Sequence, residues 1–441
     1  MVSRFGIGRL RISPRLVQRW RARLRGRRRR GRRNGDGEVL FPVDGQGMVA
    51  VHTLQGTPDD TEGPRVAILH ATAGSGHRSA AMAIAAAIAD QSPHATVREV
   101  DTLVFASRLY RNTYAASYNA MAARAPRLWG VLYHSWGLAP VHKGTAPVRL
   151  AVDRLNLRRL VRVTEHEGPD AIVCTHFLPV EALSHRRGRG HLNVPLFCVI
   201  TDFVAHPFWA FPHVDRYFVA NDEVAAQLAG HGVPYDRIET TGIPVDPRFS
   251  RDIGRETARD RLGLSQAQPV VLIMGGGSGV GPLAELARRV SGLPSRPQVI
   301  VICGTNARLH AQVSALAETA EAGAIRAVGF THEVDVWLEA SDLLVGKAGG
   351  LTCSEALVKG VPIVVFRPTP GQEVRNAEYV ERHGAGLHAD TADQVEATVG
   401  RWLANPGELQ QRRQSARALG RPEAAEWVAA QVLEAAEQAA S

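Results

Sequence analysis

The sequence has no run of eighteen apolar residues, so no segment is predicted to cross a membrane as a helix. It contains only four cysteines in 441 residues, and no two of them form a C-x-x-C pair. Three stand within apolar runs and one in a predicted helix, which indicates small core residues of a cytosolic protein rather than disulfides or metal ligands. No Asp-x-Asp follows a predicted strand, so we expect no metal site.

Acidic residues are absent from the first 33 positions, which hold fourteen arginines. The formal charge of the whole chain is +9, so the other residues carry 9 minus 14, or −5, and the basicity belongs to this tail. Ser13 and Pro14 can begin a helix with Leu16, Trp20 and Leu24 on one side, which predicts an anchor to an anionic membrane surface. The alternative is a disordered arginine-rich extension. RNA binding is not favoured, because no recognition module follows the tail.

The chain as a whole has 45% hydrophobic and 22% charged residues and is long enough for two to three α/β domains with full cores. Residues 34–63 are polar and contain several Gly and Pro, which predicts a linker with one short strand at residues 48–54. Apolar runs that predict buried strands begin at residue 65.

The most informative stretch is residues 341–376. An apolar run at residues 343–345 ends at a glycine, Gly349 and Gly350 follow, and a helix-like segment leads to a second apolar run at residues 361–366. In such a unit the first helical N–H groups lack backbone partners, and two residues without Cβ atoms let an anion approach them. We predict that a diphosphate binds there, beside Thr352. A Gly-Gly pair can also serve only for tight packing.

Two further groups extend this predicted site. Glu355 lies about one and a half helical turns beyond Gly350, where a carboxylate can accept both hydroxyls of a ribose. The second apolar run leads to the polar residues Gln372 and Glu373, at the carboxyl edge of the sheet where ligands of open α/β folds bind. The predicted contacts to a diphosphate, a ribose and a sugar follow one another along the site, which indicates a nucleotide-sugar ligand.

Another glycine-rich turn follows the first predicted strand, residues 65–72. It reads Ala-Gly-Ser-Gly-His over residues 73–77 and opens an alanine-rich helix. The turn is too short for a P-loop and lacks the third glycine of a dinucleotide-binding fingerprint. His77 stands where the helix macrodipole disfavours an imidazolium, so we expect a neutral ring that can act as a general base. The alternative is a histidine that only caps the helix.

A later strand of the same half also ends in polar residues. The run at residues 195–201 is followed by Asp202, His206 and Trp209, on the same predicted sheet edge as His77. A carboxylate at that edge can orient the base or an acceptor.

Residues 103–143 hold a large share of the aromatic side chains, including Trp129 and Trp136. Aromatics among apolar and basic residues, without strand alternation, predict a helical surface that touches the bilayer interface and admits a lipid. A buried helical insert would have a similar composition.

The second half opens with an apolar run at residues 269–274 and a longer glycine loop, Gly275, Gly276, Gly277, Ser278 and Gly279. The backbone N–H groups of this loop would give a diphosphate a second set of donors. A further strand end places Phe330 before a polar turn.

These motifs resemble those of the glycosyltransferase family that contains monogalactosyldiacylglycerol synthases and processive diacylglycerol glucosyltransferases. The family's segments K-P-G-G-L-T-x-x-E and P-x-P-G-Q-E-x-x-N are similar to residues 347–355 and 368–376, with Ala348 in place of Pro. Its segments G-G-G-H-x-x-[SA]-A and T-D-x-x-x-H-P-x-W are similar to residues 74–80 and 201–209, with Ser75 in place of Gly. The resemblance covers residues 65–390.

The resemblance implies an α/β chain with the GT-B fold, in which two Rossmann-like domains face an interdomain cleft. We expect a basic tail and linker over residues 1–63 and an acceptor- and membrane-side domain over residues 64–245. A nucleotide-sugar-binding domain over residues 246–391 and C-terminal helices over residues 392–441, packing back across the domains, complete the expected chain.

The function implied is inverting transfer of a hexose from a UDP-sugar to diacylglycerol, with the UDP-sugar as substrate and without a cofactor or metal. The catalytic residues would be His77 and Asp202, and the backbone at Phe330 would receive the uracil. The donor-binding set would be Gly275, Gly276, Gly277, Ser278, Phe330, Gly349, Gly350, Thr352, Glu355, Gln372 and Glu373. The acceptor and membrane set would be His206, Trp209, Trp129 and Trp136.

The expected partners are diacylglycerol or a similar lipid and an anionic membrane surface, with the protein peripheral on the cytoplasmic face of the plasma membrane. The residues leave the sugar open among glucose, galactose and N-acetylglucosamine. An enzyme of the same fold that uses UDP-N-acetylglucosamine, either a 2-epimerase or a lipid-linked transferase, is one alternative. A non-catalytic protein that binds membranes or RNA through the arginine tail is the other.

Overall fold

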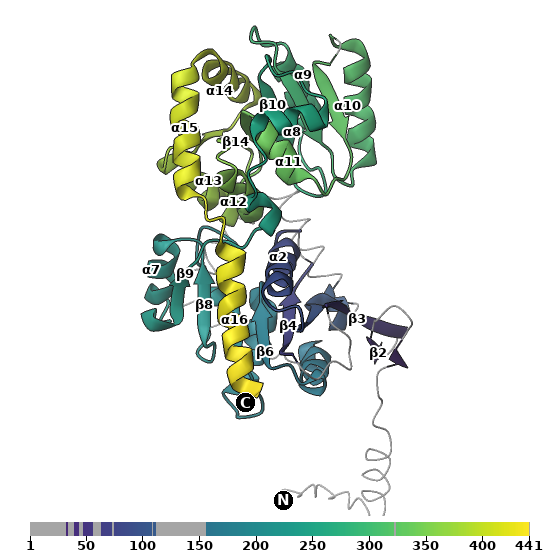
Figure 1. Ribbon diagram of the computed structural model, residues 1–441, viewed down its shortest axis with the longest axis vertical. Coiled ribbons are helices and arrows are strands. Elements are labelled where there is room, and N and C mark those ends of the chain that lie inside the picture. The colour runs from purple at the N-terminus through teal and green to yellow at the C-terminus, as the bar shows by residue number, and fades with distance from the viewer. Residues whose placement is uncertain are drawn as a thin grey trace, which may run out of the picture. The chain divides into compact units, whose positions relative to one another are not determined.

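The computed structural model describes residues 32–33, 39–43, 47–55, 63–72, 75–107, 109–111, 156–321 and 323–440 (Figure 1). The predicted amphipathic helix of the tail and the stretch with Trp129 and Trp136 lie outside these residues. Residues 1–51 and residues 52–441 form separate units. None of the described helices is long and apolar enough to cross a membrane.

The first unit contains an antiparallel ladder. Strand β1 (Arg32–Arg33) pairs with β2 (Val39–Val43), and β2 pairs with the first part of β3 (Gly47–Gln55). The sequence predicted one short strand here, at residues 48–54. The structure adds β2, which pairs antiparallel with β3, from Val39 opposite Val51 to Val43 opposite Gly47.

The second unit begins with a sheet of six parallel strands in the order β5-β4-β6-β7-β8-β9. Nearly all residues of β4, β6 and β7 are buried, as expected for parallel strands that are covered on both faces. The strands are β4 (Arg65–His70), β5 (Thr96–Asp101), β6 (Ala171–Cys174), β7 (Leu196–Val199), β8 (Arg216–Val219) and β9 (Ile238–Thr240). The helices between them include α2 (Gly76–Gln91), α6 (Phe177–Arg187) and α7 (Asp222–Gly230).

A second sheet of six parallel strands follows in the order β12-β11-β10-β13-β14-β15. Its strands are β10 (Val270–Met274), β11 (Gln298–Ile302), β12 (Ile325–Val328), β13 (Leu343–Gly346), β14 (Ile363–Phe366) and β15 (Gly386–Ala389). Its helices are α8 (Arg255–Leu262), α9 (Leu283–Ser291), α10 (Ala307–Thr319), α11 (Val334–Ala340), α12 (Gly350–Val358), α13 (Gln372–Arg382), α14 (Ala392–Ala404) and α15 (Pro406–Leu419).

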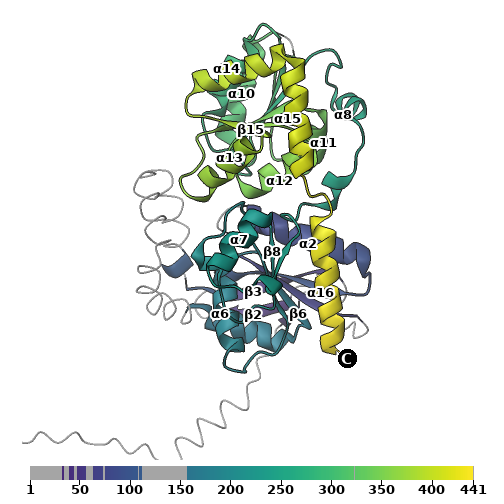
Figure 2. The same cartoon turned by 90° about the vertical axis from the view of Figure 1, so that its left-hand side faces the viewer.

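Each sheet has its own apolar core, and the last helix returns to the first one. Val428, Val432 and Ala436 of α16 (Ala424–Ala440) belong to the same buried cluster as Ile84 and Ile88 of α2. Figures 1 and 2 show α16 running beside α2. All four cysteines are buried and unpaired, as predicted.

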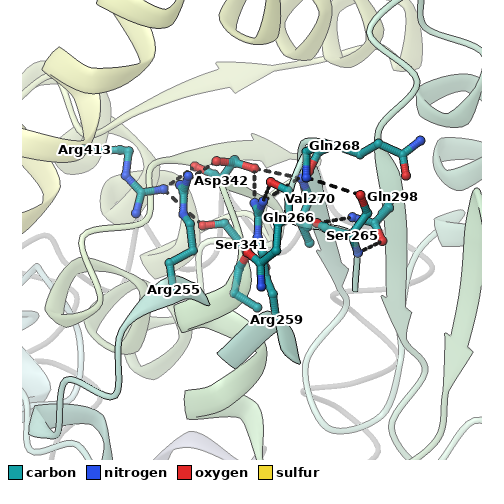
Figure 3. A network of polar contacts seen from close by, with 12 residues as sticks. Arg255, Arg259, Ser265, Gln266, Gln268, Val270, Gln298, Ser341, Asp342 and Arg413 are labelled. Atoms are coloured by element: carbon teal, nitrogen blue, oxygen red, sulfur yellow. Dashed lines mark hydrogen bonds and ion pairs between the residues drawn. The ribbon is translucent and has the colours of Figure 1, made fainter. Parts of the chain in front are cut away.

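A buried polar network closes the amino ends of β10 and β13 (Figure 3). The carboxylate of Asp342 accepts from Arg259 and from the backbone N–H of Val270, each over 2.8 Å, and pairs with Arg255. Arg413 of α15 donates to the Asp342 carbonyl over 3.2 Å. The network ties α8 and α15 to the amino edge of the sheet and leaves the carboxyl edge to the loops described next.

Candidate active site

His77 lies in the first turn of α2, after the carboxyl end of β4. Its Nδ1 lies 2.8 Å from the carbonyl oxygen of Thr175, which follows β6, and 2.9 Å from the hydroxyl of Thr201, which lies beyond β7. The Thr175 hydroxyl donates to the His77 carbonyl over 2.8 Å. Segments that follow three neighbouring strands therefore fix the orientation of this half-buried imidazole.

The contacts also settle which ring nitrogen of His77 carries the proton. A carbonyl oxygen only accepts, so Nδ1 carries the proton and Nε2 has the free lone pair. Burial lowers the pKa of His77 to about 4, against the hydrogen bond to Thr175, which raises it. The ring is therefore neutral at pH 7. The sequence led us to expect this state from the helix macrodipole, whereas burial is the main cause.

Asp202 stands next to the threonine that holds the imidazole. Burial raises the pKa of Asp202 to about 6, the hydrogen bond from Asn376 lowers it, and the Glu373 carboxylate raises it further. The Asn376 Nδ2 donates to Asp202 Oδ1 over 3.1 Å. Asp202 is thus a carboxyl group that exchanges its proton near neutral pH and that faces residues of α13.

The start of α12 meets the first sheet at Thr201. A Cβ atom on Gly350 would lie 2.0 Å from the carbonyl oxygen of Thr201, a distance that no side chain can occupy. Gly349 is the N-cap, and the N–H groups of the first helical turn have no partner within the helix. The helix that presents these donors therefore touches the residue that holds His77.

Glu355 lies in the second turn of α12 and is partly buried. Burial, followed by the carboxylates of Asp246 and Asp335, raises the pKa of Glu355 to about 8. Asp246 forms an ion pair with Arg248, in which Oδ2 lies 2.9 Å from Nη2. Within the described residues nothing forms a hydrogen bond with the Glu355 carboxyl, so it is available to ligand hydroxyls.

The glycine loop after β10 is held by the neighbouring loop after β11. Thr305 N donates to the Gly277 carbonyl over 2.9 Å, and Asn306 Nδ2 donates to the Gly279 carbonyl over 3.0 Å. A Cβ on Gly279 would lie 2.2 Å from the Cys303 carbonyl, and φ at this residue is +54°, so the position requires glycine. Ser278 is exposed at the tip. Apart from Ser278, the loop consists of glycine and offers backbone groups only.

Gln372 and Glu373 begin α13, after Gly371 at φ +107°. Glu373 Oε2 accepts from the Thr369 N–H over 2.6 Å, and Glu373 Oε1 lies 3.0 Å from the Lys347 ammonium. The PGQE segment is thereby joined to the loop that precedes α12.

The other predicted residues differ in exposure. Phe330 is 60% exposed after β12, and Thr352 is half-buried on α12. His206 and Trp209 are buried, and the Trp209 ring packs edge-on against Phe177 with centroids 5.8 Å apart. Both side chains therefore pack inside the first half of the chain.

The described residues contain no group of three or more His, Cys, Asp or Glu side chains that could hold a metal ion. The strand ends present a neutral imidazole, three carboxyl groups, one ammonium and backbone N–H groups at the start of α12.

Residues 77–245 match the monogalactosyldiacylglycerol (MGDG) synthase family, and residues 270–428 match the glycosyltransferase family 28 C-terminal domain. A processive diacylglycerol beta-glucosyltransferase of Bacillus pumilus (strain SAFR-032) is 32% identical over 267 residues, which are 60% of this chain and 69% of that protein. The chain belongs to this glycosyltransferase family. A second member, from Bacillus thuringiensis (strain Al Hakam), is 32% identical over 63% of this chain and 71% of its own length.

Solved structures agree with this family in fold. Acinetobacter baumannii MurG has a TM-score of 0.54 and 17% identity, covering 84% of this chain and 99% of that one. The Staphylococcus aureus MnaA-UDP co-structure has a TM-score of 0.53 and 12% identity, covering 83% and 94%. The predicted family and the predicted GT-B fold, with two Rossmann-like sheets, are confirmed.

Four residues to which the sequence gave no role connect the parts of the site: Lys347, Thr175, Thr201 and Asn376. Three of them stood within or beside a quoted motif, so the signal was present. The sequence did not identify their partners, because each contact joins residues that are distant in the chain.

Proposed function

We propose that this protein is an inverting glycosyltransferase that transfers a hexose from a UDP-sugar to the sn-3 hydroxyl of diacylglycerol. The proposal rests on the two contacts that Thr201 makes. Its hydroxyl contacts the imidazole of His77, and its carbonyl lies against Gly350 at the start of α12. A base and a diphosphate-binding helix are adjacent in this arrangement, as a single displacement requires.

In the proposed reaction the diphosphate lies on the N–H groups at Gly349, Gly350 and Thr352 and on those of the loop from Gly275 to Gly279. Helix N-termini favour anions, so these groups stabilise UDP as it leaves. Glu355 binds the ribose hydroxyls, the backbone at Phe330 binds the uracil, and Gln372 and Glu373 bind the hexose.

His77 takes the proton of the acceptor hydroxyl on Nε2 while that oxygen attacks the anomeric carbon. Because Nδ1–H is held by Thr175 and Thr201, the lone pair of Nε2 keeps one direction. Asp202, one residue from Thr201, orients the acceptor. Attack opposite the departing diphosphate inverts the anomeric centre, so an α-linked donor gives a β-linked product, which agrees with the Bacillus relatives being named beta-glucosyltransferases.

We propose glucose as the hexose, because both Bacillus relatives are named as glucosyltransferases, and diacylglycerol as the acceptor for the same reason. We assign residues 64–245, with His206 and Trp209, to the acceptor side and residues 246–391 to the donor side, with residues 392–441 packing back across them. The UDP-sugar is the substrate, and the proposed reaction uses no cofactor.

We further propose that the protein works as a peripheral protein on the inner face of the plasma membrane. The fourteen arginines among residues 1–33 would bind anionic lipid, and the stretch with Trp129 and Trp136 would touch the bilayer interface. Both segments lie outside the described residues.

Lipid dependence tests the proposal. With UDP-glucose as donor, release of UDP is expected only when diacylglycerol vesicles are present. Equal UDP release from UDP-N-acetylglucosamine without lipid would favour an epimerase of the same fold and would contradict the proposal.

A further inference from the structure

An ion pair joins the two loops that flank the proposed donor site. The Lys347 ammonium, two residues before the N-cap of α12, lies 3.0 Å from Oε1 of Glu373 in the first turn of α13. The two side chains are 28% and 14% exposed, so the pair is only partly screened by water. The other oxygen, Oε2, accepts from the Thr369 N–H over 2.6 Å.

The surroundings of this pair are acidic. Burial, followed by the charges of Glu373, Asp202 and Glu355, raises the pKa of the Cys353 thiol, so all three carboxyl groups act on one buried side chain of α12. Asp202 has a neutral partner in the Asn376 amide. The donor brings a diphosphate with two negative charges into the same region, so an uncompensated carboxylate there would oppose binding.

We propose that Lys347 is a positioning residue that offsets the charge of Glu373 and fixes its carboxylate, so that a hexose can bind to Glu373 beside an anionic diphosphate. The inference rests on the proposed function. Each carboxylate oxygen has two acceptor positions. Oε1 uses one for Lys347 and Oε2 uses one for Thr369, which leaves one position on each oxygen for a pair of neighbouring sugar hydroxyls.

A double-mutant cycle tests this role, with affinities for UDP and UDP-glucose measured by calorimetry. Lys347→Met leaves Glu373 charged and unpaired, and we expect roughly a tenfold to hundredfold loss of UDP-glucose affinity. Adding Glu373→Gln to Lys347→Met removes that charge and should restore most of the loss. Lys347→Arg keeps the charge and should bind UDP-glucose within about threefold of the wild type.

The chain provides a matched control on the same helix. Arg375 and Glu378 of α13 form an i,i+3 pair at 3.0 Å, with side chains 49% and 52% exposed. The variants Arg375→Met and Glu378→Gln should leave UDP-glucose affinity unchanged, because exposed pairs contribute little.

Glu373→Gln alone gives a measurement that does not need the Lys347→Met protein to fold. It leaves the Lys347 charge unpaired near the diphosphate, so UDP should bind at least as tightly as to the wild type. Weaker UDP binding by Glu373→Gln would overturn the inference. A double variant whose loss of UDP-glucose affinity equals the product of the losses in the two single variants would overturn it too. A wild-type protein that binds no UDP-sugar would instead overturn the proposed function, and this inference with it.

Discussion

Asn376 of α13 binds Asp202 of the loop after β7, with Nδ2 3.1 Å from Oδ1. The same Nδ2 donates to the Ala348 carbonyl over 2.9 Å, and Oδ1 of Asn376 accepts from the Phe203 N–H over 2.9 Å. Asn376 is fully buried, and its three hydrogen bonds fix the orientation of its amide group. One amide group thus sets the position of a proposed catalytic carboxyl relative to the loop before α12.

The proposed base gives the first prediction. His77→Ala removes the lone pair that accepts the proton, and we expect turnover to fall about a hundredfold or more at pH 7, with UDP affinity unchanged. Activity on diacylglycerol vesicles and calorimetry with UDP separate the two effects. His94→Ala, at an exposed turn, is the control and should behave as wild type. Near-normal turnover by His77→Ala would remove this residue from the chemistry.

The ribose contact gives the second prediction. Glu355→Ala should weaken UDP binding about tenfold to hundredfold, because it removes two hydrogen bonds to the ribose hydroxyls and each contributes roughly 0.5 to 1.5 kcal/mol. Calorimetry with UDP measures the loss directly. An unchanged dissociation constant would place Glu355 outside the donor site.

The third prediction concerns pH and stability. The folded protein keeps the Glu355 proton up to a pKa of about 8, whereas the unfolded chain loses it near the ordinary value of 4.5. Between these values the folded state binds more protons, so the free energy of unfolding falls as the pH rises. The Glu355→Gln side chain does not titrate, so the melting temperature of this variant should rise relative to that of the wild type as the pH increases from about 5 to 8. Parallel melting curves across this range would contradict the assignment.

The fourth prediction compares two adjacent glycines. Gly350→Ala would place a methyl group 2.0 Å from the Thr201 carbonyl, and overpacking of this kind costs about 1–3 kcal/mol or more. Gly349→Ala meets only the Thr352 hydroxyl, at 3.9 Å, and φ of −65° suits alanine. Urea unfolding should show a loss of stability for Gly350→Ala alone. Equal stabilities would mean that α12 does not approach Thr201 this closely.

Strands such as β4, β10, β13 and β14 were predictable from sequence because they are buried on both faces. Continuous apolar runs such as residues 343–345 and 361–366 appear as β13 and β14 with only small shifts at their ends. The polar residues at their carboxyl ends followed from the same reasoning, since parallel strands share that edge.

The contacts inside the site could not be predicted in this way. Thr201 and His77 are 124 positions apart, and Asn376 and Asp202 are 174 apart, so their pairing depends on how whole elements pack. A polar residue in a motif shows that a partner is needed, but it does not identify the partner. Trp209 shows the same limit, because an amphipathic ring suits an interface or a core, and here it is 5% exposed.

The tail gives the fifth prediction. Deleting residues 1–33 removes fourteen arginines and should weaken activity on anionic vesicles at low salt, while UDP binding by residues 52–441, a separate unit, stays intact. Salt should reduce the difference, because it shortens the Debye length. Equal activity of both proteins on anionic and neutral vesicles would show that the tail is not an anchor.

We propose that one displacement at this site joins a hexose to a lipid hydroxyl with inversion. Its most direct test is the structure of the product formed from carbon-13-labelled UDP-glucose and diacylglycerol vesicles, determined by NMR of the extracted lipid. We expect a β-linked glucosyl-diacylglycerol that disappears in the His77→Ala protein. An α-linked product, or labelled sugar found only in water-soluble compounds, would contradict it.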